Sequence, residues 1–196
     1  MHLRDSVDVL TFVYMTGYGP LSAKVLGILA NGFVLSLNRN KKCRFQLHQE
    51  CDRLWHEIDR KELYHILRRF RLNGFVETIK KTNKVERIFL SKRGKMHWLK
   101  YQFHNLRLKK PKRWDKKWRM VLFDIPETQK KIRDALRLKL KNLGFLEFQK
   151  SVFIYPYSCK DEINFIINFY NIEENVYYLE TPISPDDNFR KWFNLK

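Results

Sequence analysis

The stretch Trp114-Asp-Lys-Lys-Trp-Arg-Met-Val-Leu-Phe-Asp-Ile-Pro-Glu127 decides the fold of this chain. It contains an uninterrupted apolar run, Met120–Phe123, with the length and residue types of a buried strand. Asp124 ends the run, and Pro126 favours a helix start because its fixed φ suits a first turn that needs no N–H. The stretch therefore predicts a buried strand that delivers one carboxylate to its C-terminal end.

The elements after this strand predict the order βαββαβ. Apolar residues recur at helical spacing from about Thr128 to Leu143, and Gly144 ends that helix. This order implies a ferredoxin-like sandwich, in which four antiparallel strands carry two helices on one face. The aromatic tail at 182–196 is expected to dock, with a partner subunit as one candidate surface. The later elements are predicted at Phe145–Gln149, Ser151–Tyr157, Lys160–Tyr170 and Val176–Glu180.

The positive charge of the chain is concentrated in its first part. The 196 residues have a net charge of +18 at pH 7. Residues 1–113 carry 25 Lys and Arg against 9 Asp and Glu, whereas residues 114–196 carry 14 against 12. A general solubility charge would not explain this asymmetry. A basic domain that binds a polyanion, joined to a near-neutral second domain, does explain it, and nucleic acid is the expected partner.

The first part of the chain predicts helices followed by a hairpin. Asp59 and Glu62 have the spacing of a capping box, and Asn73-Gly74 is a helix-stop pair that tolerates left-handed geometry. Strands at 75–80 and 85–90 form a hairpin with a basic tip, and Ser91 caps a further helix that runs to about Asn105. The predicted helices before the hairpin span residues 6–15, 21–37, about 47–58 and 60–72, and Asn31-Gly32 is a candidate break in the second of them.

This order of helices and hairpin resembles a winged helix-turn-helix. The string Asn-Gly-Phe-Val-Glu (73–77), followed by Ile-Phe-Leu-Ser-Lys-Arg-Gly-Lys (88–95), is similar to the recognition-helix end, wing and following helix of bacterial and archaeal regulators. Arg can fork onto guanine or phosphate, and Tyr and His can reach bases or phosphates. A solvated basic face used for protein contacts is the alternative. The predicted DNA-binding residues are Lys61, Tyr64, His65, Arg68, Arg69, Arg71, Lys80, Lys81 and Lys84.

The cysteines indicate neither a disulfide framework nor a zinc site. Cys43, Cys51 and Cys159 form no Cys-x-x-Cys pair, and the cytoplasm is the expected compartment. Cys43, His48, Cys51 and His56 match no zinc finger or ribbon, and they lie in a segment with the pattern of one amphipathic helix. The uncharged runs 9–23 and 25–38 are too short and too interrupted for a membrane span. Asp5 and Asp8 are likewise unlike a secretory signal.

The residues around the first strand resemble one family. Trp-Arg-Met-Val-Leu-Phe-Asp-Ile-Pro-Glu (118–127) and the segment from Leu143 to Ile163, with Gln-Lys-Ser-Val-Phe-Ile-Tyr-Pro-Tyr-Ser-Cys, are similar to the repressors of phenylacetic acid catabolism (PaaX-like). The resemblance extends over about 21–196. It implies a winged helix joined to a ferredoxin-like domain similar to the small CRISPR adaptation subunit. Lys116 departs from the pattern, since relatives often have Gly there.

Asp124 has two interpretations. The resemblance places it where the CRISPR subunit has the strand-end aspartate of a proposed metal site at the dimer interface, where a divalent ion would activate water for phosphodiester cleavage. Asp124 could equally accept N–H bonds from the turn at Ile125–Thr128. The resemblance implies a structural or dimer role for Gln149, Lys150 and Ser151. No His or Lys is placed to activate Ser151 as a nucleophile.

Together these patterns predict an α+β protein of two domains. A winged helix-turn-helix is expected at 1–105, a basic linker at 106–117, and a ferredoxin-like dimerisation domain with a C-terminal tail at 118–196. We expect a homodimeric, cytoplasmic transcriptional regulator, a repressor, which reads palindromic half-sites of double-stranded DNA and needs no cofactor. A small-molecule effector is left open. The alternative is a Mg²⁺-dependent endonuclease using Asp124, or a CRISPR adaptation subunit with an added DNA-binding head.

Overall fold

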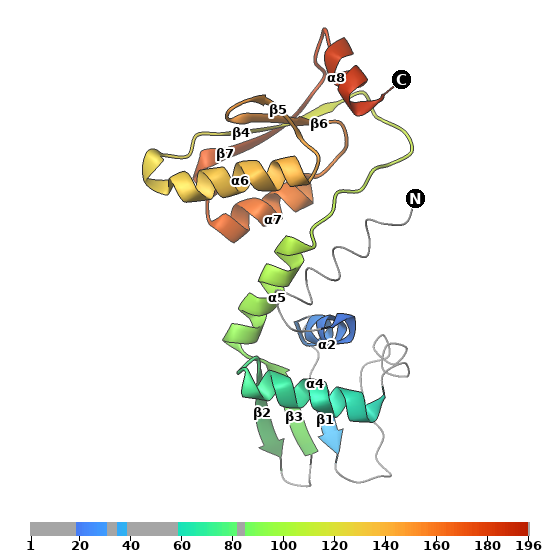
Figure 1. Cartoon of the computed structure of the whole chain (residues 1–196), viewed down its shortest axis with the longest axis vertical. Coiled ribbons are helices and arrows are strands. Elements are labelled where there is room, and N and C mark those ends of the chain that lie inside the picture. Colours follow the sequence, from blue (N-terminus) through green and yellow to red (C-terminus); the bar gives the residue numbers. More distant parts are fainter. Residues whose placement is uncertain (1–18, 31–34, 39–58, 82–84, 196) are drawn as a thin grey trace. The chain divides into compact units, whose positions relative to one another are not determined.

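The structure, a computed structural model, describes residues 19–30, 35–38, 59–81 and 85–195. The chain divides into two compact units, Met1–Gln102 and Phe103–Lys196, whose elements are labelled in Figure 1. The predicted helices at 6–15 and 47–58 lie outside the described residues, as do Cys43, His48, Cys51 and His56. Within the described residues, no helix is both long and apolar enough to cross a membrane.

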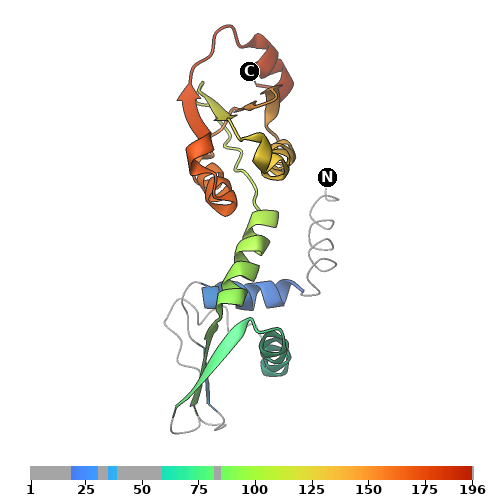
Figure 2. The same cartoon turned by 90° about the vertical axis from the view of Figure 1, so that its left-hand side faces the viewer.

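The described residues of the first unit form three helices and a small antiparallel sheet. The sheet order is β1-β3-β2, so β3 lies in the middle. Val76 pairs with Leu90 at one end of the β2–β3 hairpin and Lys81 pairs with Val85 at the other. Figure 2 shows α4 beside this sheet. The elements are α2 (Pro20–Ala30), β1 (Leu35–Asn38), α4 (Arg60–Leu72), β2 (Val76–Lys81), β3 (Val85–Leu90) and α5 (Lys92–His104).

The structure corrects one element of the first unit. The helix predicted at 21–37 ends at Ala30, and Leu35–Asn38 forms β1, which pairs with β3. Gly32 disfavours continuation of the helix, and Leu35 and Leu37 alternate with polar residues as in a strand. A strand of four residues is too short to be recognised by its periodicity alone.

The core of the first unit is formed by the apolar faces of α2 and α4 against the sheet. Val25, Leu26 and Leu29 of α2 join α4 residues and Ile88 of the central strand in one buried cluster. At Gly27 an added Cβ would lie 2.8 Å from the Trp98 indole, so the absence of a side chain lets α5 approach α2 closely. The buried residues of α4 are Leu63, Ile66, Leu67 and Phe70.

The second unit has the predicted ferredoxin-like topology. Its four strands are ordered β5-β6-β4-β7, and neighbouring strands are antiparallel. Figures 1 and 2 show α6 and α7 side by side on one face of this sheet. The elements are β4 (Trp118–Phe123), η1 (Glu127–Gln129), α6 (Lys130–Asn142), β5 (Leu146–Gln149), β6 (Val152–Tyr155), α7 (Lys160–Tyr170), η2 (Glu173–Asn175), β7 (Val176–Thr181) and α8 (Asp187–Phe193).

The core of the second unit lies between the sheet and its two helices. Val121 and Phe123 of β4, Leu136 and Leu140 of α6, and Ile163 of α7 are among its buried residues. Leu106 and Leu108, from the segment predicted as a linker, pack against this same cluster. This part of the predicted linker therefore contributes apolar side chains to the second unit.

The aromatic tail docks on its own unit. The fully buried Trp118 donates its indole N–H to Asp186 Oδ2 at 3.0 Å. Its ring lies 5.5 Å from that of Phe189 and 5.8 Å from that of Phe193, measured between centroids. α8 therefore packs on the beginning of β4, and the tail covers one end of the sheet.

Candidate nucleic-acid interface

Asp59 sets the start of α4. It has an extended backbone, and its carboxylate accepts a hydrogen bond from the Lys61 N–H at 3.2 Å. This contact satisfies one N–H group that the helix leaves without an internal partner. The Asp59 contact of the predicted capping box is therefore present, and it places the start of α4 at Arg60.

The solvent side of α4 carries several basic side chains. Lys61, His65, Arg68 and Leu72 have the spacing of one helical face, and all four are exposed. Tyr64 lies on the same side and is 50% exposed. Arg69 and Arg71 are exposed on the flanks of this face. Leu72, 78% exposed, was missed by the sequence reasoning, because an apolar residue at a helix end is normally assigned to the core.

The end of α4 is closed by Asn73-Gly74-Phe75. Gly74 has φ +67°, and its N–H donates to the Arg71 carbonyl at 3.0 Å. The Phe75 N–H donates to the Phe70 carbonyl at 2.8 Å. These two bonds and the contact of the Phe70 and Phe75 rings form a Schellman motif, which satisfies carbonyls at the helix end.

Ser91 joins this helix end to the start of α5. Its hydroxyl donates to the Gly74 carbonyl at 2.6 Å and accepts from the Gly94 N–H at 3.0 Å. The Ser91 N–H donates to the Phe75 carbonyl at 2.9 Å. A Cβ on Gly94 would lie 2.1 Å from that same carbonyl oxygen, so this position requires glycine. The segments 73–77 and 88–95, which carry the resemblance to winged helix-turn-helix regulators, are thus in direct contact.

The hairpin places its basic residues at the end far from α5. The backbones of Lys80 and Lys81 belong to β2 beside the hairpin turn, and Lys84 lies outside the described residues. Ile79 is 52% exposed and pairs with the exposed Arg87 of β3. The sequence reasoning assigned no role to these two residues, which share one face of the hairpin.

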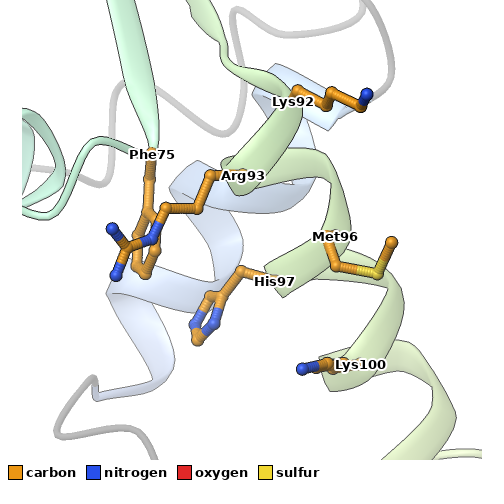
Figure 3. A pocket seen from close by; sticks show the side chains of 6 residues that line it. All are labelled: Phe75, Lys92, Arg93, Met96, His97 and Lys100. Carbon is orange, nitrogen blue, oxygen red and sulfur yellow. The ribbon is translucent and has the colours of Figure 1, made fainter.

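A groove lies beside α5 at the other end of the hairpin (Figure 3). The His97 ring stacks on Phe75 with 4.4 Å between centroids, and the guanidinium carbon of Arg93 lies 5.8 Å from the Phe75 centroid. Burial, together with the charges of Lys100 and Arg93, lowers the pKa of His97. We call this site the α5 groove; its volume is about 650 Å³, and it is lined by Phe75, Lys92, Arg93, Met96, His97 and Lys100.

Asp124 lies at the end of β4, with its carboxylate exposed. The Asp124 N–H donates to the Asn175 carbonyl at 2.9 Å, and the Asn175 side-chain amide donates to the Asp124 carbonyl at 3.0 Å. Asn175, which the sequence reasoning missed, therefore joins the end of β4 to the start of β7. Within the described residues, no three His, Cys, Asp or Glu side chains are grouped so that they could hold a metal ion.

The residues between β5 and β6 make backbone contacts. The Lys150 carbonyl accepts from Arg137 Nε at 2.7 Å, and the Ser151 carbonyl accepts from the Phe123 N–H at 3.1 Å.

Cys159 is buried, and burial raises the pKa of its thiol to about 12. The thiol is therefore protonated and a poor nucleophile at neutral pH.

The second unit exposes apolar side chains on the sheet face away from α6 and α7. Tyr177 is 63% exposed and Leu179 is 48% exposed. In β4 they pair with Leu122 and Met120, which are half-buried and alternate with the core-facing Val121 and Phe123. This face, which we call the open sheet face, leaves an apolar surface in contact with solvent.

Comparison with known proteins identifies the second unit. Residues 111–190 match the family model described as the PaaX protein central Cas2-like domain. This match agrees with the resemblance found in the sequence and with the strand order of the second unit. No curated protein matches the chain.

Proposed function

We propose that this chain is a PaaX-like transcriptional regulator that binds double-stranded DNA, and the match of residues 111–190 to the PaaX central Cas2-like domain supports this proposal. The first unit would act as a winged helix-turn-helix, with α4 as the recognition helix in the major groove. A repressor acting in the cytoplasm is the role that the family resemblance implies.

The observation that carries this proposal is the two-sided character of α4. Leu63, Ile66 and Leu67 are buried, whereas Lys61, His65 and Arg68 are exposed on the opposite side. Cationic and hydrogen-bonding side chains on the exposed side of a helix can bind phosphates and base edges. The +16 net charge of residues 1–113 would favour association with a polyanion.

The open sheet face supports a homodimer. Exposed apolar surface is removed from water when a second copy packs on it, and a two-fold axis makes one patch complementary to itself. The first unit of each copy could then bind one half of a palindromic site. Replacing Tyr177 and Leu179 with Lys should shift the sedimentation-equilibrium mass toward the monomer. Leu138→Lys, at an exposed Leu of α6, is the control that should leave the mass unchanged.

DNA binding is tested with the double variant Arg68→Ala, Arg69→Ala. Affinity for a duplex selected from a random pool should fall, and the slope of log K against log salt should become shallower by roughly 0.9 for each phosphate that the variant no longer neutralises. Lys130→Ala, Lys131→Ala removes the same charge from exposed positions of α6 and should leave binding nearly unchanged. The proposal fails if both double variants bind DNA as the wild type does.

The alternative function, a Mg²⁺-dependent endonuclease, would depend on Asp124. One exposed carboxylate per chain is a weak metal site, so a second chain would have to supply further ligands. Incubation of the purified protein with Mg²⁺ or Mn²⁺ and DNA or RNA separates the two functions. Cleavage that Asp124→Ala abolishes would favour the enzyme over a regulator that acts by binding alone.

A further inference from the structure

The α5 groove concentrates positive charge without a carboxylate to balance it. α5 contains no Asp or Glu. In the part of the chain that the structure describes, no salt bridge engages Lys92, Arg93 or Lys100. Burial lowers the pKa of His97, and the charges of Lys100 and Arg93 lower it further. Like charges gathered in this way repel one another, and a bound anion would remove that repulsion.

The side chains of the groove are arranged around a fixed ring. Phe75 is 7% exposed, and its backbone is hydrogen bonded to Phe70 on one side and Ser91 on the other. Figure 3 shows Arg93 beside the Phe75 ring, with His97 one turn further along α5. Because Phe75 cannot move independently of the helix end, its contacts restrict the rotamers of Arg93 and His97. Such preorganisation lowers the entropy cost of binding a ligand.

We propose that the α5 groove binds the phosphate monoester group of a small organic molecule. Arg93, His97 and Lys100 have the spacing of one helical face, so they can approach the same group. An Arg fork can contact two phosphate oxygens, and Lys adds a compact charge. A phosphate monoester carries more negative charge at neutral pH than a carboxylate, which matches a site with several cations. Met96 and the edge of Phe75 offer apolar contacts to the organic part.

The position of the groove favours a free ligand over the DNA backbone. The groove lies where Val76 pairs with Leu90, whereas Lys81 pairs with Val85 at the turn of the hairpin. The strand between these pairs is about 17 Å long at the usual rise per residue. The groove therefore lies at the opposite end of the hairpin from the basic residues expected to contact DNA.

A ligand in this groove would lie next to the end of α4. The Phe75 N–H closes that helix, and the Phe75 carbonyl contacts the start of α5. Occupation of the groove would favour the arrangement of α4 that suits the ligand, and so would change DNA affinity. This regulatory consequence rests on the proposed DNA-binding function, whereas the phosphate site itself does not.

The site is tested by titrating the intact protein with adenosine monophosphate and with inorganic phosphate, in the absence of DNA. Calorimetry should show saturable binding, and the His97 imidazole resonances should shift in NMR spectra. The double variant Arg93→Gln, Lys100→Gln should weaken binding of the nucleotide about tenfold or more, because it removes two charge-assisted hydrogen bonds. Lys95→Gln is the matched control, since Lys95 is exposed on α5 but does not line the groove.

Three results would overturn the proposal. The first is no saturable binding of either probe by the wild type. The second is an equal loss of binding in Lys95→Gln, which would mean diffuse charge attraction without a site. The third is a double variant that binds the nucleotide normally but loses DNA affinity and salt dependence, because the groove would then contact the duplex backbone. Since the nucleotide titration contains no DNA, its failure is distinct from failure of the proposed DNA-binding function.

Discussion

Arg119 and Asp115 form a two-pronged ion pair between a buried guanidinium and a half-exposed carboxylate. The two terminal nitrogens of Arg119 lie 2.6 and 2.5 Å from the two carboxylate oxygens. Arg119 also donates to the carbonyls of Lys117 and Pro156, both at 2.8 Å, and Glu180 lies 3.7 Å away. One strand residue thus joins the turn before β4 to the end of β6.

Replacing Asp115 with Asn should destabilise the protein by about 1–3 kcal/mol, because Arg119 remains buried without its closest anionic partner. The hydrogen bond from Arg119 lowers the pKa of Asp115. A carboxyl with a lower pKa when folded stabilises the fold above its unfolded pKa, and that contribution is lost as pH falls through the folded value. Urea denaturation at about pH 7 and about pH 3 should therefore show a smaller acid loss for the variant than for the wild type.

The matched control is Asp134→Asn, since Asp134 pairs with Arg137 at 3.2 Å on the surface of α6. An exposed pair contributes little, so this variant should change the unfolding free energy by less than about 1 kcal/mol. If Asp115→Asn is no more destabilising than Asp134→Asn, the Arg119–Asp115 ion pair does not have the role described.

Lys116→Gly should stabilise the protein by about 0.5–1 kcal/mol. Lys116 has φ +60°, in the left-handed region that disfavours a residue with a Cβ. This is also the position where the family resemblance led us to expect Gly. Thermal denaturation would measure the gain. Lys117→Gly, at a neighbour without positive φ, should instead lower the melting temperature, and a gain in both variants would refute the explanation.

Gly94→Ala should destabilise the first unit by about 1–3 kcal/mol, since the new Cβ would meet a backbone oxygen that cannot rotate away. The expected clash is with the Phe75 carbonyl, so amide exchange at the end of α4 should also accelerate. Gly19→Ala is the control, because an added Cβ there meets nothing within 4 Å. Unchanged exchange at Phe75 in the Gly94 variant would contradict this prediction.

Stability should rise with pH above neutrality because of Lys139. Burial, with the charge of Arg107, lowers the pKa of Lys139 to about 8. Its ammonium group donates to the Phe103 carbonyl and lies 4.5 Å from the Phe103 ring centroid. The unfolded chain holds this proton up to a higher pH than the folded chain, so folding becomes more favourable as pH rises from about 8 toward 10.5.

The check is urea denaturation across that alkaline range in the wild type and in Lys139→Met, which keeps the apolar stem. In Lys139→Met, most of the increase in unfolding free energy with pH should be absent. Lys141→Met is the control, because Lys141 is exposed and pairs with Glu147 on the surface. A rise that persists in Lys139→Met would assign the effect to another group.

Much of the fold follows from local patterns in the sequence. The order of the second unit was predictable because Gly144 and the apolar spacing of α6 and α7 mark the ends and faces of its helices. The role of Arg119 was not, since an Arg within a strand normally indicates a solvent-facing position. Its partners Pro156 and Glu180 lie far along the chain, and only the strand pairing brings them together.

The candidate interface was predictable in its chemistry and less so in its arrangement. The exposed face of α4 follows from helical periodicity, which also separates Arg68 from Phe70. The α5 groove was not foreseen, because Phe75 and His97 meet only when the Ser91 turn returns the chain to the end of α4. Contacts of this kind depend on tertiary structure, and no local spacing indicates them.

The hydrogen bonds of Ser91 have a consequence for how this protein can vary. They connect the residues just before β2 to those just after β3, so the two ends of the hairpin lie next to each other. Residues 76–90 therefore form a hairpin whose two ends are held together. Val76, Ile88 and Leu90 pack in the core with α4 and are constrained by it, whereas a homologue could change the length or charge of the hairpin at the turn end without displacing α4.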